Sequence, residues 1–170
     1  STVAASPGGN TPIRVVYVRG PQPHLATAER QDQRDDIPQP PRPPRVEPFV
    51  SNASFPIGLQ FAPDGRLFFG EQREGRVRIA SATGSMNPEP FVSLRVPRGR
   101  DQGILGLALD PSFIENHWVY VFYSEADGDN RPIRNRVVRF TERDGVASEQ
   151  AVILDDLPVN ETGAFSGGHN

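Results

Sequence analysis

From Phe49 onward, the chain consists of short runs in which apolar and polar residues alternate. Alternation with a period of two is typical of β-strands that bury one face and leave the other in water. Turn-forming residues separate the runs, as at Pro63-Asp64-Gly65. The pattern predicts four short strands, at residues 57–62, 66–72, 76–80 and 90–94.

The same pattern recurs farther along the chain. The segment Gly58-Leu-Gln-Phe-Ala-Pro-Asp64 is similar to Gly106-Leu-Ala-Leu-Asp-Pro-Ser112, an offset of 48 residues. Three further runs follow it, at residues 118–123, 134–140 and 151–157. A four-stranded unit that repeats every 40–50 residues is typical of β-propeller blades. The predicted fold class is therefore all-β, a β-propeller of which about two four-stranded blades are present.

Two blades do not close a propeller, because a closed ring needs at least four of them. Residues 49–157 supply about two blades, and the approach to a third follows. We therefore expect residues 49–170 to be the N-terminal blades of a larger propeller. The alternative is a complete eight-stranded sandwich of two sheets. A repeat of 48 residues is not expected for that architecture.

The first 48 residues differ in character. Ten of the 18 prolines precede Phe49, and six of these fall between Pro38 and Pro48. Such a composition favours an extended, irregular leader or linker. The run Ile13-Arg-Val-Val-Tyr-Val18 is the exception, because its residues favour strands. It is either an isolated edge strand that docks on the following domain or an apolar patch in an unstructured leader.

Composition excludes several classes of site and partner. The chain has no cysteine, which excludes disulfides, thiolate chemistry and cysteine-ligated metals. Its net charge of −3 and the lack of a dense basic run argue against a nucleic-acid partner. No apolar stretch is long enough to predict a membrane-spanning helix. All 18 basic residues are arginine, so no lysine is present for Schiff-base or phosphate-loop chemistry.

Sequence motifs for common catalytic sites are also missing. There is no Gly-x-Ser-x-Gly nucleophile, no His-Glu-x-x-His zinc helix and no dinucleotide-binding fingerprint. The oxygen-rich segment 127–130 lacks the spaced ligands of an EF-hand and is predicted to be a hairpin loop. Among the three histidines, His24 is expected to be solvated and His117 structural. Glu71 and Gln72 end a predicted strand, where a polar side chain can face the central channel.

Longer motifs carry a more specific signal. Asp101-Gln-Gly-Ile-Leu-Gly-Leu-Ala-Leu-Asp-Pro-Ser-Phe113 is followed by Asn116-x-Trp-Val-Tyr-Val-Phe-Tyr123. Arg136-Val-Val-Arg-Phe140, Ile153-Leu-Asp-Asp-Leu-Pro158 and Ser166-Gly-Gly-His-Asn170 come later. Together these segments resemble the glucose/sorbosone dehydrogenase family of soluble, six-bladed quinoprotein sugar dehydrogenases. The resemblance runs from about Phe49 to the last residue.

This resemblance implies a quinoprotein that oxidises the anomeric carbon of an aldose, with pyrroloquinoline quinone (PQQ) and calcium at one mouth of the propeller. His169 would be the general base, and Asp101 or Gln102 would contact a substrate hydroxyl. Gly168 stands where the family's glucose dehydrogenases carry an acidic residue, which fits the broader aldose dehydrogenase branch. Most cofactor contacts of the family lie in later blades, so the chain alone is expected to be inactive.

The resemblance also implies a periplasmic or secreted protein that passes electrons to an external acceptor. Two other functions remain open, because fold does not determine function. One is a non-catalytic propeller that binds a protein or a glycan. The other is a calcium-dependent, lactonase-type propeller, in which Glu71 would be one ligand of the metal.

Overall fold

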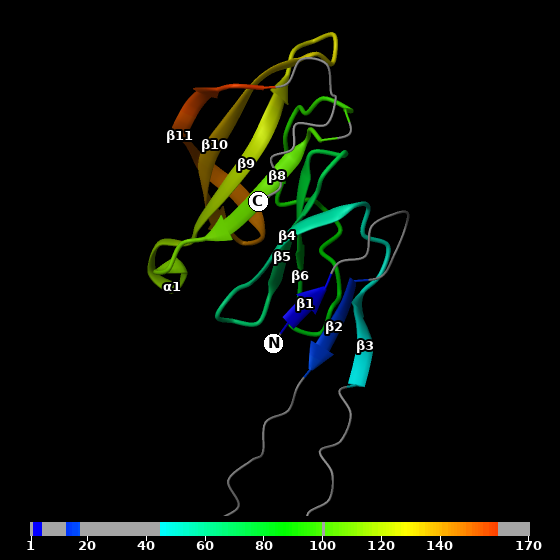
Figure 1. The fold of residues 1–170 in the computed structure, drawn as a ribbon. Coiled ribbons are helices and arrows are strands. Elements are labelled where there is room, and N and C mark those ends of the chain that lie inside the picture. The colour runs from blue at the N-terminus through cyan, green and yellow to red at the C-terminus, as the bar shows by residue number, and fades with distance from the viewer. Residues whose placement is uncertain (1, 5–12, 18–44, 100, 160–170) are drawn as a thin grey trace, which may run out of the picture.

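The computed structural model describes residues 2–4, 13–17, 45–99 and 101–159. Most of these residues form two antiparallel four-stranded sheets (Figure 1). The first contains β4 (Pro56–Phe61), β5 (Leu67–Glu71), β6 (Arg76–Ala80) and β7 (Val92–Ser93) in sequential order. The second contains β8 (Ile104–Leu109), β9 (Trp118–Ala126), β10 (Pro132–Arg143) and β11 (Val146–Leu157), also in sequential order. The predicted all-β fold of two consecutive propeller blades is confirmed.

A third, smaller sheet precedes the blades. It contains β1 (Thr2–Ala4), β2 (Ile13–Tyr17) and β3 (Arg45–Val50), in that order and antiparallel. The strand-favouring run at residues 13–18 thus forms β2, which pairs with β3. The prediction of an irregular segment over residues 1–48 does not anticipate these strands, since it took no account of pairing between distant runs. The rest of that segment lies outside the described residues.

The turn between β4 and β5 shows how local sequence sets the strand pairing. Gly65 adopts a φ of +87°, a left-handed conformation that is unstrained for glycine. Its backbone N–H donates to the carbonyl of Ala62 at 2.9 Å, and Ala62 N–H donates to the carbonyl of Arg66 at 2.8 Å. The Asp64 carboxylate accepts from the backbone N–H of Arg66 at 3.0 Å. The predicted Pro-Asp-Gly turn is therefore present and is braced by its own side chain.

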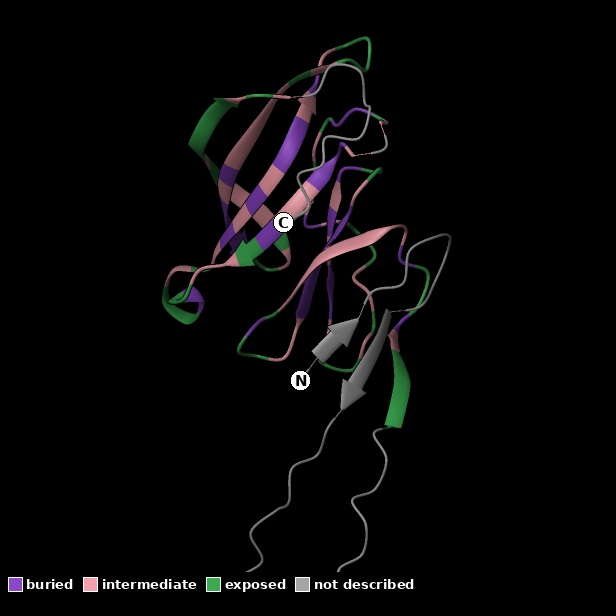
Figure 2. Cartoon of the chain, viewed as in Figure 1, coloured by how far each residue is buried: buried purple, intermediate pink, exposed green. Residues whose placement is uncertain are grey.

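The main core lies between the two blades. Alternate residues of β9, Val119, Val121 and Tyr123, are buried and face the first sheet (Figure 2). Edge-to-face aromatic pairs add to this core: Phe68–Phe91, Phe68–Phe113 and Phe91–Phe140 have ring centroids 5.9, 5.6 and 6.2 Å apart. This geometry is favourable for aromatic rings. Face-to-face burial between neighbouring sheets is how propeller blades are stabilised.

The opposite face of the first sheet is also covered. Leu67 and Phe69 of β5 pack there with Val50, at the end of β3, and with Ala53. As a result every residue of β5 is buried, in contrast to an ordinary strand with one face in water.

Backbones of the two blades approach each other closely at their inner strands, β4 and β8. Gly58 has a φ of +63°, and a Cβ added there would lie 2.9 Å from the backbone nitrogen of Leu107. A Cβ added at Gly70 would lie 2.7 Å from a methyl carbon of Ile104. Only glycine leaves room for these contacts, so the two glycines fix how closely the blades pack.

An ion pair joins the blades at a second place. The Arg66 Nη2 atom, in the β4–β5 turn, donates to Glu142 Oε2 of β10 at 3.0 Å. Glu142 Oε1 accepts from the backbone N–H of Gly145 at 2.7 Å. Burial raises the pKa of the Glu142 carboxyl, but these donors outweigh it and hold the pKa below its ordinary value.

One short helix, α1 (Phe113–Asn116), connects β8 with β9. Within the described ranges of the chain, no helix has the length and hydropathy needed to cross a membrane.

Substitution of Gly58 by Ala is expected to lower the free energy of unfolding by about 2–4 kcal/mol, because the new methyl group meets Leu107 and an alanine is strained at positive φ. Urea unfolding followed by circular dichroism measures this value. Gly128→Ala is the matched control, because a Cβ at Gly128 meets nothing within 4 Å. It should change the free energy by less than about 0.5 kcal/mol. Equal effects of the two substitutions would contradict the close approach.

Stability is also expected to fall on acidification through the Arg66–Glu142 pair. A carboxyl whose pKa is lowered by folding stabilises the native state above its unfolded pKa, and this contribution disappears as pH falls through the folded pKa. The loss should begin near pH 4.5, the ordinary pKa of this group. Glu142→Gln should cost about 2 kcal/mol at neutral pH. The difference between variant and wild type should shrink below pH 4.5, and an unchanged difference would refute the assignment.

Candidate functional site

Polar side chains gather at both ends of the two sheets. We call the upper end the set of residues 71–76, 101–104 and 124–135, where β5 and β9 end and β8 begins. The lower end contains residues 62–66, 110–117 and 142–146, in the turns at the opposite ends of the same strands. The predicted substrate-binding pair, Asp101 and Gln102, lies at the upper end.

Gln102 is buried, with 5% of its surface exposed, whereas Asp101 is half-buried. The residues next to Gln102 hold it in place. Gly103 has a φ of +105°, and a Cβ there would collide with the carbonyl oxygen of Gln72. That same oxygen accepts from the backbone N–H of Ile104 at 3.0 Å. The Gln102 side chain is thus fixed where the first blade meets the second.

Backbone contacts also tie this segment to the second blade. The carbonyl of Gly103 accepts from the backbone N–H of Ser124 at 2.9 Å. On the other side, a Cβ at Gly99 would collide with the Gln102 carboxamide. Close packing on two sides means that the rotamer of Gln102 is set by the fold, a condition for a precise binding contact.

Glu71 is the second buried polar group of the upper end, with 2% of its surface exposed. Its Oε1 accepts from the backbone N–H of Ser54 at 3.0 Å, and its Oε2 accepts from Arg76 Nε at 2.9 Å. A buried carboxylate needs such partners, because burial without them is costly. With both oxygens engaged by protein donors, Glu71 fixes the end of β5 and is not arranged as a free calcium ligand.

The second blade contributes a charged network to the same end. Glu125 Oε2 accepts from Arg134 Nε at 2.7 Å and from Arg136 Nη1 at 3.1 Å. Arg136 Nη2 also donates to Asp155 Oδ2 at 2.9 Å. Burial, followed by the charge of Glu125, raises the pKa of the nearby Tyr123 hydroxyl. The network gives this end a rigid polar rim.

Two other sequence predictions have a clear outcome. Residues 127–130 form the β9–β10 hairpin turn as predicted, in which Asp127 Oδ1 accepts from the backbone N–H groups of Asp129 and Arg131, both at 2.9 Å. In the described part of the chain, no three His, Asp or Glu side chains gather as a metal-binding group.

His117 lies at the lower end and ends α1, as its predicted structural role requires. Its φ is +56°, and its backbone N–H donates to the carbonyl of Phe113 at 2.9 Å. His169, the predicted general base, lies outside the described residues, as does Gly168.

Gln102 determines what the described upper end can do chemically. A carboxamide donates and accepts hydrogen bonds but does not take up a proton near neutral pH. It is therefore suited to orient a hydroxyl group, while proton transfer requires another residue.

Sequence reasoning missed the side chains that surround Gln102 and the cluster at the lower end. Arg66, Glu142 and Asp144 come from turns in different blades and line one cavity there. The acid at the end of β10, directly before the Asp144-Gly145 turn, is the one sequence feature that could have drawn attention to the cluster.

Comparison with known proteins agrees with the two-blade architecture. A putative oxidoreductase (glucose dehydrogenase) from Thermus thermophilus is 33% identical, with a TM-score of 0.61 over 71% of this chain and 35% of that chain. The PQQ-bound aldose sugar dehydrogenase from Streptomyces coelicolor is 22% identical, with a TM-score of 0.53 over 62% of this chain and 31% of that chain. The latter likeness concerns the fold alone.

Two curated proteins match more weakly. An uncharacterised protein from Synechocystis is 30% identical over 104 residues, which cover 56% of this chain and 24% of that protein. Human Hedgehog-interacting protein is 31% identical over 87 residues, which cover 46% of this chain and 12% of that protein. The chain thus spans about a third of these solved proteins and a quarter or less of the curated ones.

The sequence profile of one family covers most of the chain. It matches residues 53–169, which include both blades and the predicted site residues Asp101, Gln102 and His169. The chain therefore belongs to the Glucose / Sorbosone dehydrogenase family.

Proposed function

We propose that the chain supplies the first two blades of a quinoprotein that oxidises an aldose at its anomeric carbon. The observation that carries the proposal is the position of Gln102, buried and fixed at the junction of the blades, within the motif that resembles the family's second blade. The glucose dehydrogenase and aldose dehydrogenase names of the solved relatives support the same reaction class. Because the chain spans about a third of these relatives, the activity belongs to the whole protein.

In this proposal Gln102 binds a hydroxyl group of the sugar and sets its orientation. Between the two predicted residues we favour Gln102 over Asp101, because close packing at Gly99 and Gly103 fixes its side chain. His169 takes the proton of the anomeric hydroxyl. Imidazole is suited to this step, since its ordinary pKa near 6.5 leaves it largely neutral at physiological pH.

The PQQ and calcium that the family resemblance implies have no complete site among the described residues. PQQ carries several carboxylates and needs cationic donors, whereas Arg76 at the upper end is already paired with Glu71. We therefore place the ligands of both groups outside the described residues. When bound, the quinone would accept the hydride of the sugar and pass electrons to an external acceptor, in a periplasmic or secreted protein.

A non-catalytic binding function is the second candidate. One observation favours it: the human relative at 31% identity is named for its interaction with another protein. An assay of the whole protein decides between the two functions. With PQQ and calcium added, reduction of a dye by several aldoses supports the enzyme, and a folded protein without turnover on any of them supports the binding module.

His169→Ala is expected to lower kcat by about a hundredfold or more, because general-base catalysis typically contributes that much. Dye reduction by the quinone-loaded whole protein measures the rate, and quinone absorbance measures loading. His24→Ala, in the predicted leader, is the matched control and should keep the full rate. Wild-type turnover in the His169 variant, with quinone bound, would remove this residue from the mechanism.

Gln102→Ala should raise KM about tenfold with a smaller effect on kcat, since it removes a hydrogen bond to the bound sugar. Gln150→Ala, an exposed position on β11, controls for loss of an amide elsewhere. Steady-state kinetics on the same aldose gives both constants. If KM is equal for the two variants, Gln102 does not contact the substrate.

A further inference from the structure

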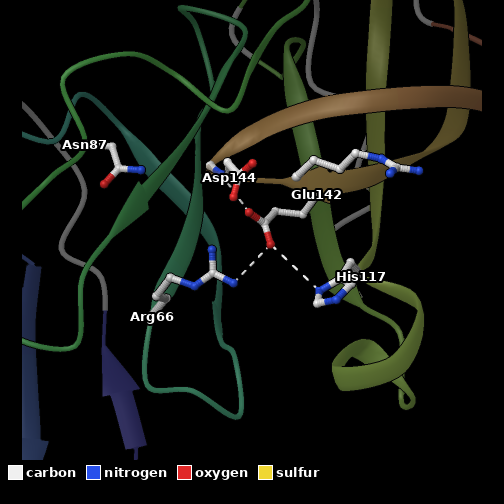
Figure 3. Close-up of a pocket in the computed structure, with 7 residues that line it drawn as sticks. Arg66, Asn87, His117, Glu142 and Asp144 are labelled. Atoms are coloured by element: carbon white, nitrogen blue, oxygen red, sulfur yellow. Dashed lines mark hydrogen bonds and ion pairs between the residues drawn. The ribbon is translucent and has the colours of Figure 1, made fainter.

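A polar cavity of about 580 Å³ lies at the lower end, between the β4–β5 turn and the β10–β11 turn (Figure 3). Its volume lies within the roughly 300–1,000 Å³ range of ligand sites. The six residues of β8 separate the two ends of the sheets, a length of about 20 Å at roughly 3.3 Å per residue. The cavity is therefore distinct from the site around Gln102.

The wall formed by the second blade is held in place by hydrogen bonds. Glu142, with 6% of its surface exposed, accepts from Gly145 N–H and from Arg66 Nη2. Its own backbone N–H donates to the carbonyl of His117 at 2.8 Å. Figure 3 shows the side chains of Arg66 and His117 pointing toward Glu142 from two different blades. One carboxylate thus joins three segments of the wall.

The opposite wall is Asn87, whose backbone is fixed on both sides. Its N–H donates to the carbonyl of Ile79 at 2.9 Å, and its carbonyl accepts from Arg78 Nη2 at 2.7 Å. A Cβ added at Gly145 would lie 3.0 Å from the Asn87 Nδ2 atom, so the amide is close to the β10–β11 turn. The cavity is preformed, which lowers the cost of binding.

Some of the lining groups are not used by the fold. Within the described residues, the carboxamide of Asn87 and the carboxylate of Asp144 make no hydrogen bond, although both line the cavity. Arg66 engages its Nε and Nη2 atoms with Asp64 and Glu142, which leaves Nη1. The cavity therefore offers an amide, a carboxylate and a guanidinium nitrogen, that is, both donors and acceptors.

The charges of the cavity restrict the ligand. An anion would be repelled by Glu142 and Asp144, and a cation by Arg66, because these charges share one small volume. The charge of Arg143 is directed to Glu149, with which it forms an ion pair. A neutral molecule with several hydroxyl groups avoids both repulsions and uses the donors and acceptors together.

We infer that this cavity is a second, non-catalytic site that binds a neutral saccharide through Asn87, Asp144 and Arg66. Such a site would retain sugar on the protein at the end opposite to the proposed reaction centre. It does not depend on the quinone or on the activity.

Trehalose and methyl α-glucoside test the inference, because both are neutral and neither has a free anomeric hydroxyl to oxidise. The full chain, without quinone, is titrated with each sugar while backbone amide shifts are recorded by NMR. Saturable shifts at Gly145, Asn87 and His117, with none at Gln102 and Gly103, are the expected result. Shifts confined to the upper end, or no saturable shift, would overturn it.

Asn87→Ala and Asp144→Ala should each weaken the binding about tenfold, the effect of one lost hydrogen bond at the upper end of the usual range. Asp129→Ala, an exposed acid in the β9–β10 turn, is the matched control and should leave the affinity unchanged. Putrescine and sulfate are titrated in parallel. If either ion shifts these amides and the sugars do not, the ligand class is wrong.

Discussion

The structure depends on the close contact between two sheets at their inner strands. Gly58 and Gly70 bring the backbone of the first blade against Leu107 and Ile104 of the second, nearer than any side chain would allow. This contact determines the depth of the aromatic core between the sheets and the alignment of the strand ends. Because both ends of each strand are aligned at once, the polar groups of the turns meet across the blades.

This alignment explains how one scaffold has two distinct polar regions. At the upper end, buried Gln102 and Glu71 are each fixed by neighbours from an adjoining segment. At the lower end, the Arg66–Glu142 pair crosses from one blade to the other. The strands between them are buried and apolar, so a change in one set of turns need not disturb the other.

The repeat could be predicted from the sequence because strand alternation and turn residues are local signals. Gly58 and Gly106 begin equivalent phrases, and the structure places both on inner strands. The pairing of β2 with β3 could not be found in this way, since it joins residues about thirty positions apart across a proline-rich segment. The partners of Glu71 and Glu142 were missed for the same reason. His169 remains a prediction that rests on the family motif.

The double burial of β5 bears on where this domain can be cut. The family match starts at residue 53, yet Val50 at the end of β3 already covers Leu67 and Phe69. An expression clone that begins at the match would leave these two large side chains facing solvent and prone to self-association. The practical N-terminal boundary of the folded unit is therefore Arg45, at the start of β3.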